Sequence, residues 1–146
     1  MQVLPVIYRL AVALWVGGVG IFTFLLTPII FKVEARDAAG RIVGYLFPAY
    51  FRWGLACGGV ALACLLMMRG KQFVPTLALL LVMVGATALG AFYIEPRAAA
   101  LKKEIPSFET TPKDHPLRRE FAKLHGISAA ANLTVFAGGV VLVILF

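Results

Sequence analysis

Four long stretches without a charged residue constrain the fold of this chain more than any other feature. They cover residues 10–31, 53–68, 73–94 and 126–146. A membrane-spanning helix needs roughly 20 apolar residues, and the second stretch reaches that length when the amphipathic residues 42–52 before it are included. Lipid admits only helices and closed barrels, and these stretches lack the alternation of barrel strands. The sequence therefore predicts four transmembrane helices.

The composition excludes a soluble domain. Of the 146 residues, 61% are hydrophobic and 14% are charged, whereas soluble domains have roughly 45–50% and about 25%. A soluble fold of this size cannot hide that excess, because small domains keep much of their surface in water. We expect a single all-α integral membrane domain over residues 1–146. Its helices are predicted at about residues 5–31, 44–68, 73–95 and 116–146.

Lysine and arginine residues in the connections predict the orientation. The first connection carries Lys32, Arg36 and Arg41. The third carries Arg97, Lys102, Lys103, Lys113, Arg118, Arg119 and Lys123. The opposite side has Arg9, Arg69 and Lys71. The positive-inside rule places both longer connections in the cytoplasm and both termini outside, with a basic loop between helices 3 and 4. We expect a bacterial inner-membrane protein without a nucleic-acid partner, because the net charge of +7 suits an anionic leaflet.

Polar side chains in or beside the apolar stretches predict a pocket, since polar groups in hydrocarbon are costly without a partner or a function. On the fourth helix, His125, Ser128 and Asn132 follow helical spacing and share one face. Glu95 and Arg97 leave the third helix on the same predicted side of the membrane. The expected pocket residues are Tyr50, Arg52, Glu95, Arg97, His125, Ser128 and Asn132.

Each of these residues also has a purely structural interpretation. His125 can carry a proton or bind a metal, but Ser128 and Asn132 can equally hold helices together through hydrogen bonds. Arg52 can extend to the headgroups, as arginines near helix ends often do. Glu95 can form a structural ion pair with one of the arginines. No catalytic residue is predicted, because the chain lacks the common phosphate-binding, zinc-protease and serine-hydrolase motifs.

The second helix has two further patterns. Cys57, Cys64 and Met68 form one sulfur stripe, which soft metals such as Cu(I) prefer, although cysteine and methionine are also ordinary packing residues. Gly54 and Gly58 form a GxxxG pair, and Gly17 and Gly18 lie on the first helix. These glycines predict close helix packing within the bundle or between the protomers of a homo-oligomer.

Several phrases together resemble the four-helix family of transmembrane protein 205-like proteins over nearly the whole chain. They are Trp15-Val16-Gly17-Gly18, Phe47-Pro48-Ala49-Tyr50, Glu95-Pro96-Arg97 and Phe121 to Ser128 followed by Asn132. The resemblance implies a four-helix fold and a link to the passage of platinum drugs, with Cys57, Cys64 and Met68 as the positions involved. A weaker similarity in size and layout connects the chain to four-helix copper-resistance and haem-binding oxidase families, which have a histidine that the first helix here lacks.

These observations favour a small transporter or export facilitator for a small substrate or a soft metal species. A haem- or metal-binding membrane redox protein is one alternative, although the other histidine, His115, lies in the loop and no paired haem ligands are evident. A structural or lipid-interacting module is another. Its basic loop would contact anionic headgroups through Lys102, Lys103, Arg118, Arg119 and Lys123.

Overall fold

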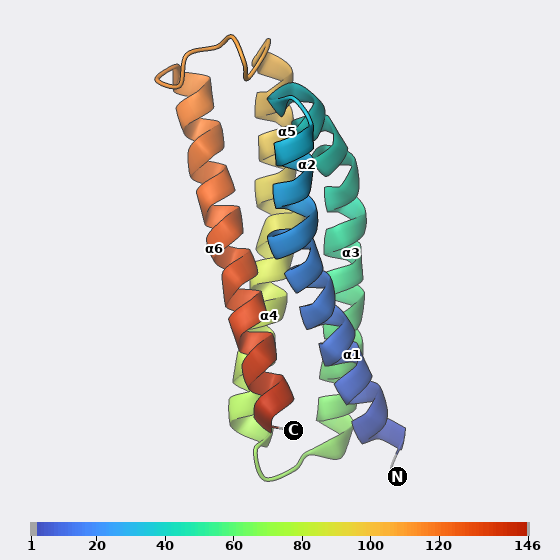
Figure 1. Cartoon of the computed structure of the whole chain (residues 1–146). Helices are drawn as coiled ribbons and strands as arrows, with labels where there is room; N and C mark the ends of the chain where they lie inside the picture. The colour runs from blue at the N-terminus through green and yellow to red at the C-terminus, as the bar shows by residue number, and fades with distance from the viewer. Residues whose placement is uncertain (1–2, 146) are drawn as a thin grey trace.

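The protein folds into four long antiparallel helical spans, each long and apolar enough to cross a membrane (Figure 1). The computed structural model describes residues 3–145, in which helices are present and strands are not. The elements are α1 (Val3–Gly20), η1 (Ile21–Leu26), α2 (Thr27–Val33), α3 (Arg36–Met68), α4 (Phe73–Leu89), η2 (Gly90–Ile94), α5 (Glu95–Glu104) and α6 (Pro116–Leu145). The predicted all-α, four-helix membrane fold is confirmed.

The spans form a ring in which each contacts the next in the chain and α6 closes back on α1. The start of α1, the end of α6 and the α3–α4 turn lie at one end of the bundle (Figure 1). The other end holds the connection between α5 and α6. We call it the polar end, because all seven acidic residues and ten of the 14 lysines and arginines belong to it.

Two prolines explain why the first and third spans are wound more widely near the polar end. The π-helical segments η1 and η2 come directly before the turns that contain Pro28 and Pro96. A proline ring clashes with the carbonyl four residues earlier, and a wider turn relieves that clash. The third span therefore continues through Pro96 to Glu104, beyond the end that the sequence predicts near residue 95.

The second span also differs from the expected bounds, since it begins at Arg36 rather than near residue 44. Ala39 and Val43 are buried, which gives this first part of α3 a packing face. The Asp37 carboxylate accepts hydrogen bonds from the Ser107 hydroxyl and from the Phe108 N–H at 2.7 Å. The long connection is thereby attached to the start of α3.

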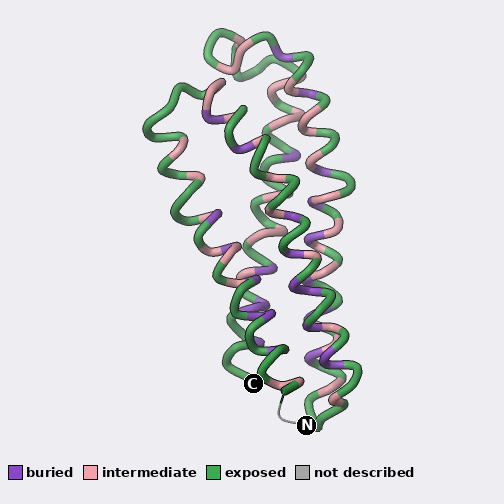
Figure 2. Tube along the Cα trace, turned by 90° about the vertical axis from the view of Figure 1, so that its right-hand side faces the viewer, coloured by how far each residue is buried: buried purple, intermediate pink, exposed green. Residues whose placement is uncertain are grey.

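The core lies along the centre of the bundle, around fully buried Tyr8, Trp15, Leu80 and Met83. Buried positions alternate with exposed ones along every span (Figure 2). Many large apolar side chains face outward, as expected for a surface in contact with lipid. With 33 residues, α3 is about 50 Å long, which exceeds the roughly 30 Å of a bilayer's hydrocarbon core. The span is therefore longer than the hydrocarbon core alone requires.

Candidate functional site

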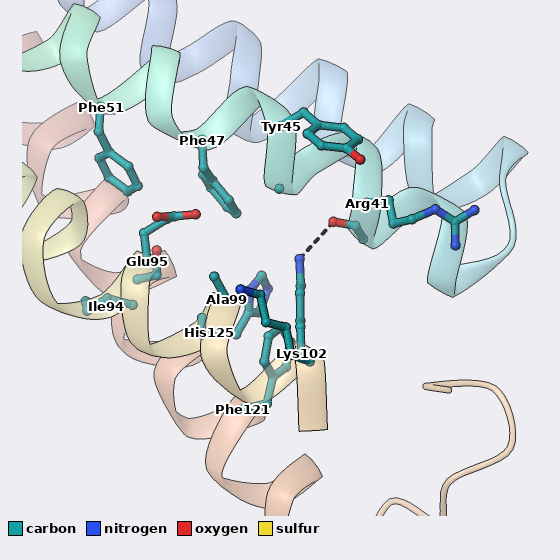
Figure 3. A pocket seen from close by; sticks show the side chains of 15 residues that line it. Arg41, Tyr45, Phe47, Phe51, Ile94, Glu95, Ala99, Lys102, Phe121 and His125 are labelled. Atoms are coloured by element: carbon teal, nitrogen blue, oxygen red, sulfur yellow. Dashed lines mark hydrogen bonds between the residues drawn. The ribbon is translucent and has the colours of Figure 1, made fainter. Parts of the chain in front are cut away.

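A cavity of about 400 Å³ opens at the polar end between α3, α5 and α6 (Figure 3). Three residues of the predicted pocket line it: Glu95 from the start of α5, and His125 and Ser128 from α6. We call this cavity the Glu95 lobe. The structure thus brings a carboxylate and an imidazole from different spans to one cavity, in which Phe47 and Phe51 supply much of the apolar wall.

Lys102 provides the cationic group of this lobe. Its side chain is half-buried and crosses from α5 to α3, where Nζ donates a hydrogen bond of 2.8 Å to the Gly40 carbonyl (Figure 3). Gly40 and Gly44 lie one turn apart and leave room for it, because a Cβ there would be 3.8 Å and 3.5 Å from Nζ. The Phe121 ring centroid lies 5.8 Å from the same nitrogen, within range of a cation–π interaction.

Tyr50 and Asn132 meet deeper in the bundle, outside the Glu95 lobe. The Tyr50 hydroxyl donates a hydrogen bond of 3.0 Å to Asn132 Oδ1, which joins α3 to α6. The Tyr50 ring also stacks on Phe22 of η1, with centroids 4.3 Å apart. Aromatic rings and one interhelical hydrogen bond therefore separate the lobe from the rest of the bundle.

Two arginines of the predicted pocket lie elsewhere. Arg97 is exposed and pairs with Glu120 of α6 at 3.0 Å, so that it connects the outer faces of two helices. Arg52 is exposed on α3 and does not line the lobe. Helical geometry explains the difference, because Arg97 lies two residues after Glu95 and therefore faces another direction.

A second cavity, of about 450 Å³, adjoins the first on the side of α2. We call it the portal lobe. Thr27 and Phe31 of α2 and Arg118 and Ala122 of α6 line it. The residues shared by the two lobes are Gly40, Phe47, Lys102, Phe121 and His125. Lys102 therefore lies at the boundary between two spaces of similar size.

The sulfur residues belong to the core rather than to a cavity at the polar end. Cys57 and Cys64 are 7% and 5% exposed and are part of the central apolar cluster, and Met68 packs against it. Within residues 3–145, no group of three or more His, Cys, Asp or Glu side chains is arranged to hold a metal ion. The surroundings of these sulfur atoms are those of packing residues.

The predicted glycines divide into two groups. A Cβ at Gly54 or Gly58 would lie 3.0 Å or 2.8 Å from Trp15, so α1 already occupies this face of α3. Gly18 likewise lies close to the indole of Trp53, with 3.2 Å from an added Cβ to Nε1. Gly17 has open space around it. The GxxxG pair therefore serves packing within the chain.

The sequence predicts that Lys102 belongs to the basic loop, whereas in the structure its side chain points inward to Gly40. Two signals were available in the sequence. Ala98 and Lys102 lie one helical turn apart on the third span, and Gly40 and Gly44 share the same spacing on the second. A pair of glycines opposite a long cationic side chain provides the space that such a side chain needs. The continuity of α5 with α4 was required to place these faces opposite each other.

Comparison with known proteins agrees with a small helical membrane protein. The chain matches the family described as a domain of unknown function, DUF4149, over residues 10–107. It is 32% identical over 143 residues to an uncharacterized protein of the bacterium Aquifex aeolicus (strain VF5), covering 94% of this chain and 96% of that protein. No solved structure matches it. The resemblance to transmembrane protein 205-like proteins stays a prediction, whereas the chain itself belongs to the DUF4149 family.

Proposed function

We propose that this protein is a small membrane carrier, an export facilitator that captures an anionic and partly apolar solute in the Glu95 lobe. The observation that supports this most is the Lys102 ammonium, half-buried in a mainly apolar cavity of about 400 Å³. Ligand sites commonly have about 300–1,000 Å³ and combine apolar walls with a few polar groups. The size and chemistry of the lobe fit that description.

The charge of Lys102 favours an anionic ligand. An ammonium group has three donors, and one of them reaches a neutral carbonyl, that of Gly40. A charge held away from water is costly without a charged partner, and an ionised acceptor forms shorter and stronger hydrogen bonds. Glu95 lines the same lobe and attracts Lys102 electrostatically, but no direct ion pair joins them in the described part of the chain. An anionic solute would compete with Glu95 for Lys102.

The rings between the lobe and the core are candidates for a closed gate. Phe51 is 4% exposed and stacks on Phe47 with centroids 5.7 Å apart. Tyr50 stacks on Phe22 and is tied to Asn132. Passage of a solute would require these rings to separate. The widened turns η1 and η2 lie beside them, and such turns are frequent at functional sites.

The soft-metal substrate is the weaker proposal, because the sulfur side chains lie in the core and not in either lobe. A homo-oligomer also remains a proposal, and it would need a surface other than the Gly54–Gly58 face, which Trp15 fills. If the polar end faces the cytoplasm, as the positive-inside rule predicts, capture occurs on the cytoplasmic side and release on the other.

Uptake of radiolabelled hexyl phosphate into proteoliposomes tests the carrier. This probe combines a phosphate with a short apolar chain, and its charge keeps it from crossing lipid unaided. We expect faster uptake than into protein-free vesicles. Replacing Lys102→Gln should lower the uptake rate at limiting probe concentration about tenfold, because one charge-assisted hydrogen bond is lost. Lys123→Gln changes the charge equally but lies outside both lobes, so it should leave the uptake rate unchanged. Uptake equal to that of protein-free vesicles contradicts the proposal.

A further inference from the structure

We infer that the portal lobe binds an anionic phospholipid, which enters sideways from the surrounding leaflet between α2 and α6. If this lipid is also the transported solute, the inference names the substrate class of the proposed carrier, and that part of it depends on the proposed function. Binding of the lipid at the portal lobe does not depend on transport.

The portal lobe opens laterally between two spans. The first span packs along α6 through α1, whereas its continuation α2 packs mainly on α3. Accordingly, α6 leans away from α2 toward the polar end (Figure 1). Phe31 and Ala122 line the lobe from the two sides of this gap and are both exposed. A molecule in the leaflet can therefore reach the lobe without passing through water.

The lobe also lies at the depth of a phospholipid headgroup. Phe31 is the last residue of the uncharged stretch in the first span, and Lys32 follows it. On α6, the uncharged stretch begins directly after His125. Both residues line the lobe. The change from uncharged to charged side chains marks the boundary between hydrocarbon and headgroups, which is where a lipid phosphate resides.

The charges around the lobe suit a phosphate. Lys102, Arg118 and Arg36 line it together with His125, and no Asp or Glu is among the described residues that do so. Aromatic rings hold two of the cations in place. The Arg118 guanidinium lies 5.5 Å from the Phe108 centroid, and the Phe108 ring contacts the Phe121 ring edge-on at 4.9 Å.

Lys102 and Arg118 thus each contact one ring of an edge-to-face pair of phenylalanines, Lys102 that of Phe121 and Arg118 that of Phe108. Nη1 of Arg118 donates a hydrogen bond of 2.7 Å to the Thr111 carbonyl, so this guanidinium, like the Lys102 ammonium, has further N–H donors. Lysine and arginine both bind phosphate oxygens through such charge-assisted bonds. Both cations line the portal lobe, so each is available to the phosphodiester of a lipid bound there.

The remaining walls suit an acyl chain. Phe31, Val43 and Phe47 form the apolar side of the lobe, and exposed apolar side chains of the first span continue from there toward the middle of the span. An ammonium or choline headgroup would find no carboxylate in this lobe, because Glu95 lines the other one. The lobe should therefore prefer phosphatidylglycerol to phosphatidylethanolamine and phosphatidylcholine.

Native mass spectrometry of the full-length protein tests this preference. The detergent-solubilised protein is incubated with equal amounts of the three lipids, all with the same acyl chains, and the lipids retained are counted. Three doubly substituted proteins are compared: Lys102→Gln with Arg118→Gln, Lys102→Arg with Arg118→Lys, and Arg119→Gln with Lys123→Gln. Circular dichroism verifies that each is folded. Glycerol phosphate is added as a competitor, because it carries the phosphate without an acyl chain.

We expect retention of phosphatidylglycerol to exceed that of the other lipids about tenfold, because the ammonium or choline group of those lipids would lie among the cations of the lobe without a carboxylate to pair with. The first double substitution should abolish this preference, and the other two should keep it. Equal retention of all three lipids, preference for phosphatidylethanolamine, or equal loss in the Arg119 and Lys123 control overturns the inference. Effective competition by glycerol phosphate also overturns it, since the ligand would then be a soluble phosphate.

A second experiment needs no substitution and covers the case in which the charge variants do not fold. Phosphatidylglycerol with a diazirine in its acyl chain is photo-crosslinked to the wild-type protein. We expect labelling of peptides that contain Phe31 or Phe47, and labelling confined to other spans overturns the inference. Hexyl phosphate uptake is read out separately. Lipid retention without uptake would support the lipid site and contradict the carrier function. Uptake without lipid retention would support the carrier function and contradict the lipid site.

Discussion

The close approach of Gly90 to Phe51 gives a prediction that can be worked through in detail. Gly90 begins η2 with a helical backbone (φ −59°, ψ −50°), which alanine can adopt without strain. A Cβ at this position would lie 2.5 Å from Cε1 and 2.8 Å from Cζ of Phe51. Since carbon atoms in contact are separated by about 3.5–4.0 Å, the ring would have to move by about 1 Å.

That movement is opposed by the surroundings of the ring. Phe51 is 4% exposed and stacked on Phe47. Overpacking of this kind costs about 1–3 kcal/mol, and alanine regains up to about 1 kcal/mol through its helix propensity. Gly85 is a matched control in the same span, because a Cβ there meets nothing within 4 Å. We expect Gly90→Ala to be less stable than Gly85→Ala by about 1–3 kcal/mol.

Equilibrium unfolding of the two variants in mixed detergent micelles measures this difference. Because Phe51 lines the Glu95 lobe, Gly90→Ala should also weaken hexyl phosphate binding, which Gly85→Ala should leave unchanged. Equal free energies of unfolding in the two variants would refute the packing of Gly90 against Phe51 and the position that we assign to this ring.

Three further predictions concern single side chains. Replacing Glu95→Gln removes the negative charge that attracts Lys102, so the affinity for hexyl phosphate, measured by equilibrium dialysis, should increase several-fold; a decrease would show that Glu95 helps to bind the anion. Tyr50→Phe removes the hydrogen bond to Asn132 and should lower the free energy of unfolding by about 0.6 kcal/mol, the average for such bonds in membranes, and by no more than about 1.7 kcal/mol; an unchanged value would mean that the bond is not maintained in lipid. Asp37→Asn weakens the attachment of the connection between α5 and α6 and should speed its cleavage by trypsin in intact proteoliposomes, whereas unchanged cleavage would contradict that attachment.

The fold could be predicted from the sequence because the relevant signal is local. An uncharged stretch of about 20 residues leaves few alternatives in lipid, and residues 10–31 and 73–94 both identify helices that the structure contains. Helix ends were harder to predict. Pro96 has the properties of a helix breaker in sequence, yet the widened turn η2 accommodates it and the span continues to Glu104.

The position of some candidate site residues could be predicted. Glu95, His125 and Ser128 reach one cavity as expected, because their depth in the membrane and the helical spacing of the fourth span are both evident in the sequence. The rotation of each helix about its axis is not evident there. It depends on packing between spans, which directs Arg97 to Glu120 and Lys102 into the cavity. The same packing places Cys57 in the core.

Equilibrium binding of radiolabelled hexyl phosphate to the purified protein tests most directly whether the polar end is an anion site built around Lys102. We predict one saturable site per chain, an affinity about tenfold weaker in Lys102→Gln, and an unchanged affinity in Lys123→Gln. Absence of saturable binding, or equal weakening by the two substitutions, would contradict the proposal.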